Sequence, residues 1–214
     1  MIPRSCFRIF CLVSLMGVLY CTCTPSVSGV ETTNGFTVVA AAGSIEGTAP
    51  PYAQVFLFDT AYVPYLDQGT GLGTSVDSDG RFAFAVAPGV YNILVIEQDG
   101  SEAGILQKTV SSERSGNDTP VKSNLARTGT IRGAIAVTSG ETILVYLAGT
   151  SYYRVLSGFS SFSFSSLPPG TGWLRFAVLT SRENVDTYSA EIVQDLPVEI
   201  RPDQVTETGT VVLD

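Results

Sequence analysis

The chain has 214 residues, of which 44% are hydrophobic and 15% are charged, and its formal net charge at pH 7 is −8. It contains no histidine, which excludes Ser–His–Asp or Cys–His catalysis and any histidine-ligated zinc site. The acidic balance is repelled by nucleic acid and by anionic lipid head groups, so we expect neither as a partner.

Residues 1–20 are predicted to be a signal peptide. Arg4 and Arg8 supply a positively charged start, and an apolar run follows from Ile9 to Tyr20. This run has the length of the hydrophobic region of a signal peptide, and it is too short to cross a bilayer as a helix. We therefore expect export and removal of this segment.

All four cysteines precede residue 24, so no disulfide is expected in the folded part. An apolar run, then a cysteine, then a small polar tether over residues 21–35 resembles the signal of a bacterial lipoprotein. In that family the cysteine becomes the first mature residue and carries the lipid. The resemblance favours Cys21 as the lipidated residue, with Cys23 as the alternative. Because the bulky Tyr20 stands where lipoprotein signals carry a small residue, ordinary secretion with cleavage near Gly29 stays open.

Beyond residue 35 the pattern predicts β-strands separated by glycine and proline turns, and it shows no helical stripe. Short apolar or alternating segments indicate the strands. The clearest of them cover residues 36–40, 54–58, 81–86, 91–96, 103–110, 173–179, 188–193, 196–200 and 209–213. The polar stretch from Ser111 to Ala126 is predicted to be a loop and linker.

One pattern occurs twice along the chain, which indicates two copies of one domain. The first copy opens with Gly43-Ser-Ile-Glu-Gly47, continues through Asp77-Ser-Asp-Gly-Arg-Phe-Ala-Phe84, and reaches Ala87-Pro-Gly-Val-Tyr91. The second copy carries Gly129-Thr-Ile-Arg-Gly133, Phe162-Ser-Phe164 and Pro168-Pro-Gly170. The fold class expected is all-β, with two tandem immunoglobulin-like or prealbumin-like β-sandwiches covering residues 36–124 and 125–214.

These motifs resemble the carboxypeptidase regulatory-like domain, a prealbumin or transthyretin-like sandwich. The resemblance covers residues 43–110 well, and residues 129–213 keep its opening, its Phe-x-Phe and its Pro-Gly. Modules of this kind sit as accessory domains beside enzymes, in envelope receptors and in surface lipoproteins. The resemblance therefore implies a fold and a non-catalytic role.

The sequence Asp77-Ser-Asp79-Gly80 is predicted to be a hairpin turn, in which aspartate side chains cap the backbone and the glycine takes a positive φ. The alternative is a calcium loop, because the spacing resembles the start of an EF-hand. Pro88 stands where that loop needs its final glutamate. We expect no metal and no cofactor.

Aromatic residues on loops are the candidate binding residues. Tyr62 and Tyr65 lie in a long loop, and Tyr152 and Tyr153 stand at the corresponding place in the second copy. Such side chains can stack on sugar rings or anchor a protein partner, or they can cap their own cores. Trp173 alternates with a charged residue in a predicted strand, and we expect it in the core.

The sequence thus favours a non-catalytic envelope lipoprotein that presents two β-sandwiches as a spacer or interaction surface. A lipid anchor would hold it to a membrane, with an envelope protein or a polysaccharide as its partner. We expect the outer membrane, with secretion as the alternative location. The second hypothesis is a carbohydrate-binding or adhesion module that uses the loop tyrosines. The third is a secreted enzyme that uses loop carboxylates such as Asp67 and Asp79.

Overall fold

The computed structural model describes residues 35–41, 43–67, 71–112, 120–137, 140–181 and 188–213. These residues form sixteen β-strands, and they include no helix long and apolar enough to cross a membrane. The predicted signal peptide, both candidate lipidation cysteines and all of the tether except Gly35 lie outside the described residues.

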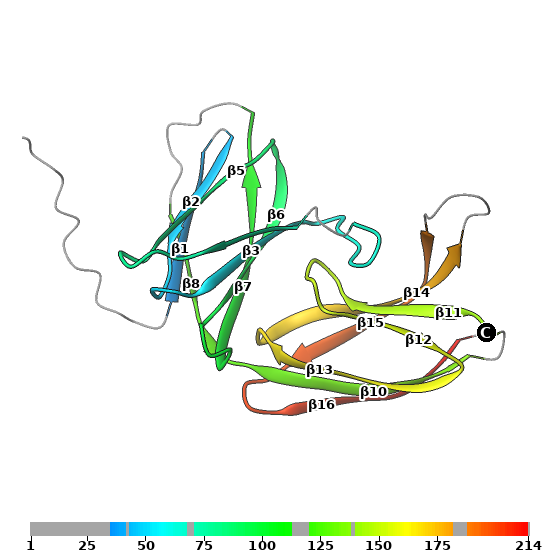
Figure 1. The fold of residues 1–214 in the computed structure, drawn as a ribbon. Coiled ribbons are helices and arrows are strands. Elements are labelled where there is room, and N and C mark those ends of the chain that lie inside the picture. The colour runs from blue at the N-terminus through cyan, green and yellow to red at the C-terminus, as the bar shows by residue number, and fades with distance from the viewer. Residues whose placement is uncertain are drawn as a thin grey trace, which may run out of the picture. The chain divides into compact units, whose positions relative to one another are not determined.

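The first half of the chain forms two antiparallel sheets (Figure 1). One has the strand order β5-β2-β1-β8, and the other has the order β4-β3-β6-β7-β9. The strands are β1 (Gly35–Ala41), β2 (Ser44–Thr48), β3 (Gln54–Asp59), β4 (Leu72–Ser75), β5 (Arg81–Ala85), β6 (Gly89–Ile96), β7 (Glu102–Val110), β8 (Val121–Asn124) and β9 (Ala126–Arg127).

The second half forms a sheet of order β13-β10-β16 and a sheet of order β12-β11-β14-β15. The strands are β10 (Gly129–Val137), β11 (Thr142–Leu147), β12 (Tyr153–Ser157), β13 (Phe159–Leu167), β14 (Gly170–Ser181), β15 (Tyr188–Ile200) and β16 (Val205–Leu213). β16 runs parallel to β10, whereas the other pairs in these two sheets are antiparallel.

The pairing order repeats between the two halves. β5 beside β2 corresponds to β13 beside β10, and β4-β3-β6-β7 corresponds to β12-β11-β14-β15. The copies differ in the second neighbour of the strand that carries the Gly-x-Ile-x-Gly motif, which is β2 in the first half and β10 in the second. In the first half it is the preceding β1, and in the second half it is the final β16. The predicted all-β class with tandem sandwiches is confirmed.

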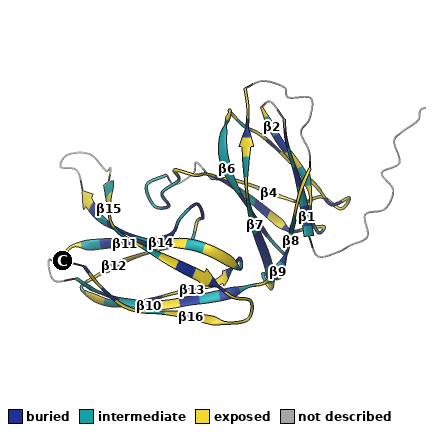
Figure 2. Cartoon of the chain, turned by 180° about the vertical axis from the view of Figure 1, so that it is seen from behind, coloured by how far each residue is buried: buried dark blue, intermediate teal, exposed yellow. Residues whose placement is uncertain are grey.

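Each pair of sheets encloses its own hydrophobic core (Figure 2). The first core has buried residues from Phe36 to Leu125, and the second has buried residues from Ile131 to Leu213. Phe82 and Phe84 both point into the first core from β5, as their two-residue spacing predicts.

The repeated Gly-x-Ile-x-Gly motif makes room for a phenylalanine on the neighbouring strand. Gly47 is paired with Phe82, and Gly133 is paired with Phe162. A Cβ at either glycine would collide with that phenylalanine ring. The isoleucine between the two glycines, Ile131 in the second copy, is fully buried. The motif therefore encodes close packing and not a ligand site.

The position of Trp173 differs from the sequence expectation. Trp173 lies on the outer face of β14 and is 51% exposed, whereas Leu174 and Phe176 point into the core. Strand side chains alternate between faces, so an offset of one position reverses burial. Trp173 and Arg175 are two residues apart on β14 and therefore share a face, and the charge of Arg175 marks that face as the outer one.

Two further expectations were wrong. The predicted linker, residues 111–126, contains β8, which pairs with β1, and the first residue of β9, which pairs with β7. The only large apolar side chain of β8, Val121, is exposed, so the segment lacks the alternating pattern of a half-buried strand. The two strands predicted within residues 188–200 form the single strand β15, with a register shift beside Ile192 that accommodates one extra residue.

We expect Gly133→Ala to lower the free energy of unfolding by about 1–3 kcal/mol, because the added methyl would collide with the hydroxyl of Thr208 and with the ring of Phe162. Urea unfolding followed by circular dichroism measures this change. Ser163→Ala, at an exposed position of β13, is the control and should change little. Equal stability of both variants would contradict the packing role of the glycine.

Candidate functional site

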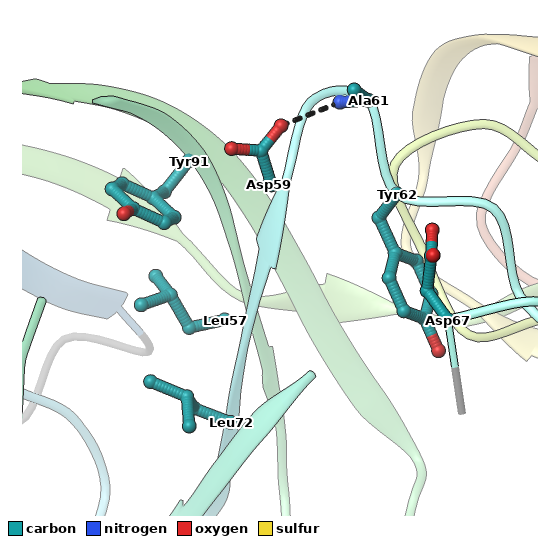
Figure 3. Close-up of a pocket in the computed structure, with 7 residues that line it drawn as sticks. All are labelled: Leu57, Asp59, Ala61, Tyr62, Asp67, Leu72 and Tyr91. Carbon is teal, nitrogen blue, oxygen red and sulfur yellow. Dashed lines mark hydrogen bonds between the residues drawn. The ribbon is translucent and has the colours of Figure 1, made fainter. Parts of the chain in front are cut away.

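A depression of about 320 Å³ opens at the end of β3, where the first core meets solvent (Figure 3). Leu57 belongs to that core, and it is paired with Leu72 on β4. Figure 3 shows these two leucines and Tyr91 on one side of β3, with Tyr62 on the other side. The remaining lining residues are Asp59, Ala61 and Asp67.

Both carboxylates of this depression hold the backbone of their own loop. An oxygen of Asp59 accepts a hydrogen bond of 2.7 Å from the amide of Ala61. An oxygen of Asp67 accepts one of 2.8 Å from the amide of Val63. These contacts are typical of side-chain caps in turns. They give both aspartates a structural role in shaping the loop.

Tyr62 and Tyr65 come from the same loop but lie in different surroundings. The ring of Tyr62 lies 4.9 Å from the ring of Phe58, measured between centroids. Partial burial raises the pKa of the Tyr62 hydroxyl, and the charge of Asp67 adds to this effect. Tyr65 has a φ of 78°, in the left-handed region that few residues with side chains adopt.

Tyr65 packs against the outer face of the β12-β11-β14-β15 sheet. Its ring centroid lies 6.1 Å from that of Tyr153 and 5.4 Å from that of Tyr188. Val63 and Leu66 join it there against a small buried cluster. That cluster consists of Leu144, Tyr146, Ala177 and Leu179. The structure therefore brings together two of the candidate binding residues, Tyr65 and Tyr153. The ring of Tyr65 is also packed against Tyr188 of the same chain.

Tyr152 is separated from its neighbour Tyr153 and caps a turn. Its hydroxyl donates a hydrogen bond of 2.7 Å to the carbonyl of Ser166, just before the Pro-Pro-Gly segment. Tyr91 does the same in the first copy, donating at 2.9 Å to the carbonyl of Ala87 before Pro-Gly. Burial raises the pKa of Tyr152 to about 12. Tyr152 thus performs in the second copy the structural role of Tyr91.

Asp77 and Asp79 occupy the predicted turn. One oxygen of Asp77 accepts hydrogen bonds from the amides of Asp79, at 3.0 Å, and Arg81, at 2.7 Å. Gly80 has a φ of 77°, and its amide donates to the carbonyl of Asp77. Within the described ranges, no group of three or more Asp, Glu, His or Cys side chains is arranged to hold a metal ion.

A second depression, of about 350 Å³, was not anticipated from the sequence. It lies on β14 and β15 and is lined by Thr171, Gly172, Trp173, Pro197, Val198 and Glu199. The lining residues are far apart along the chain, and only the pairing of β14 with β15 places them side by side. Trp173 is the one signal for this surface that the sequence contains, and the expectation that it lies in the core was wrong.

Comparison with known proteins identifies no family for the chain. No family model and no curated protein match it. Among solved structures, BcpA, the major pilin subunit of Bacillus cereus, is 13% identical, with a TM-score of 0.26 over 83% of this chain and 58% of that one. A variant of the same pilin is 15% identical, with a TM-score of 0.28 over the same shares of the two chains.

The BSP domain of a biofilm-associated protein is 14% identical, with a TM-score of 0.25 over 76% of this chain and 29% of that one. The chain therefore spans little more than half the length of the pilin and less than a third of the biofilm protein. At these TM-scores the likeness assigns neither family nor function.

We expect Tyr152→Phe to cost about 1 kcal/mol of stability at neutral pH, because the hydrogen bond from its hydroxyl to the carbonyl of Ser166 is lost. The folded protein holds the Tyr152 proton more tightly than the unfolded chain, since the pKa rises from 10.0 to about 12. The contribution of this group is therefore complete below pH 10 and is lost as the pH rises toward 12. Between pH 10 and pH 12 the free energy of unfolding should therefore fall less for Tyr152→Phe than for the wild type.

Urea midpoints measured from pH 7 upward test this expectation. Tyr52→Phe, at a position that is 58% exposed, is the matched control and should follow the wild-type curve. If Tyr152→Phe also followed that curve at every pH, the proposed cap would be absent.

Proposed function

We propose that this protein is a non-catalytic cell-envelope lipoprotein that presents its two β-sandwiches as a spacer and interaction surface. The observation that carries the proposal is that polar side chains of the loops form hydrogen bonds with the backbone of nearby turns. Asp59, Asp67 and Asp77 cap backbone amides of their own turns, and Tyr91 and Tyr152 cap carbonyls. Loops built in this way support a stable scaffold more readily than they support acid–base chemistry, which needs free carboxylates facing a substrate.

The tandem arrangement supports the spacer part of the proposal. Each half of the chain encloses its own core, and the strand order repeats between the halves. Repeating a closed module extends a surface protein without exposing a new apolar core. The resemblance to carboxypeptidase regulatory-like modules, which implies an accessory role, agrees with this proposal and remains a prediction.

We propose that lipid attached to Cys21 anchors the mature protein. The next residue, Thr22, is not an aspartate, and in Gram-negative lipoproteins this resembles a signal for the outer membrane. A covalent anchor also suits the charge of −8, because surface charge would not hold such a protein to anionic lipid. The apolar run followed by a cysteine and a polar tether is the feature that supports this step.

We expect the mature protein in the membrane fraction, with an intact mass equal to residues 21–214 plus a diacylglyceryl group and an acyl group. Cys21→Ser should move the protein out of that fraction, because the lipid loses its attachment point. Cys23→Ser is the control and should stay in the membrane. An unmodified chain that begins near Val30 and appears in the medium would overturn the anchor.

The second candidate function is carbohydrate binding or adhesion through aromatic side chains. The loop tyrosines already contact protein: Tyr65 packs on Tyr153 and Tyr188, Tyr62 packs on Phe58, and the hydroxyl of Tyr152 caps a turn. The observation that favours this function is the exposed Trp173, which lies on a different surface.

A further inference from the structure

The outer face of β14 and β15 carries an aromatic platform. Trp173 is 51% exposed, and its cross-strand partner is the exposed Pro197. Together they line the depression of about 350 Å³. A large indole exposed on a regular strand does not contribute its full area to the core, so its packing role is small. We call Trp173, Pro197, Thr171 and Glu199 the Trp173 platform.

Polar groups flank this apolar centre in a regular order. Side chains two residues apart on a strand share a face, so Asp195 and Glu199 lie on either side of Pro197. Across the sheet, Arg175 is paired with Asp195, and Thr171 is paired with Glu199. The outer face thus presents an aromatic centre between two cross-strand pairs of polar side chains.

Both carboxylates form ion pairs with arginines. The Nε of Arg175 lies 3.3 Å from an oxygen of Asp195, and an NH2 group of Arg201 lies 2.8 Å from an oxygen of Glu199. The hydrogen bond from Arg201 lowers the pKa of Glu199, which keeps this side chain ionised. Each carboxylate has more than one acceptor position, so a ligand hydroxyl can share it with the arginine.

An apolar flat centre with acceptors and donors at its edges suits a ligand that is apolar on one face and hydroxylated at its rim. A pyranose ring has these properties: its C–H groups can stack on an indole, and its hydroxyls can reach a carboxylate or a threonine. The chain carries a net charge of −8, which disfavours anionic polymers. A second copy of the chain would carry the same net negative charge and meet the same repulsion.

We propose that the Trp173 platform binds a neutral polysaccharide. The proposal rests on the proposed function, because it names the partner of the interaction surface, but it does not depend on the lipid anchor. The sugar ring stacks on Trp173, while Glu199 and Asp195 accept hydrogen bonds from hydroxyls on either side. Asp195 and Glu199 are four positions apart on β15, about 13 Å along the strand, so the platform together with Asp195 spans a short oligosaccharide segment.

Affinity electrophoresis of the purified protein tests this proposal. Native gels would contain galactomannan, xyloglucan, hydroxyethylcellulose or soluble β-glucan, with alginate as the anionic polymer. We expect retardation by at least one neutral polymer and none by alginate. Trp173→Ala should weaken the retarding interaction by about tenfold or more, as truncation of a central aromatic contact does. Glu199→Gln should weaken it less, because an amide oxygen still accepts a hydrogen bond.

Matched variants separate the platform from other aromatic surfaces. Phe159→Ala removes a side chain that is 78% exposed on β13 and should leave retardation unchanged. Tyr65→Ala tests the loop tyrosines. Circular dichroism of each variant checks that the fold is kept, and the exposed position of Trp173 makes a folded variant the expected result.

Three outcomes would overturn the proposal: no retardation by any neutral polymer, equal retardation of the wild type and Trp173→Ala, or loss in Tyr65→Ala with Trp173→Ala unaffected. None of them bears on the membrane fraction or on the intact mass. A failure of the platform is therefore distinguishable from a failure of the anchored scaffold.

Discussion

Each strand of this protein can bury only one face in its sandwich, because successive side chains point to opposite sides of a sheet. In β5, Phe82 and Phe84 are buried while their neighbours are exposed. All four cysteines precede residue 24, so the two hydrophobic cores, and not disulfides, hold the described strands together. Any surface function must then use the outer faces or the loops, and the structure commits several loop side chains to capping.

The two copies show how one position can change its role while the core is kept. Ile93 of β6 and Leu174 of β14 occupy equivalent core positions, each pairing with an inward residue of the adjacent central strand. By this register Tyr91 corresponds to Gly172, and Asn92 corresponds to Trp173. The first copy therefore places its aromatic at the core edge, and the second places its aromatic on the outer face. Tyr152 supplies the turn cap that Gly172 cannot supply.

Motifs whose meaning lies in local geometry could be predicted from the sequence. The alternation of Phe82 and Phe84, the turn at Asp77 and the all-β class follow from the two-residue period and from turn chemistry. The repeat also has a physical basis, since the second glycine of each motif, Gly47 or Gly133, leaves room for a phenylalanine on the next strand.

Features that depend on pairing between distant strands could not be predicted. β8 has little apolar pattern of its own, and it becomes a strand because β1 offers it an edge. Tyr65 is covered by residues of a sheet far along the chain, which no local spacing reveals. Trp173 was misplaced by one position in register, and in a strand that error exchanges core for surface.

The proposed sugar-binding surface exists only if Trp173 faces solvent. The exposure of Trp173 can be measured directly because the chain contains a single tryptophan. The measurement is acrylamide quenching of tryptophan fluorescence in the folded protein and in the urea-unfolded chain. An indole that is 51% exposed should be quenched to a large fraction of the unfolded value, with emission close to that of indole in water. Blue-shifted emission that acrylamide barely quenches would place Trp173 in the core, and it would contradict both the register of β14 and the platform built on it.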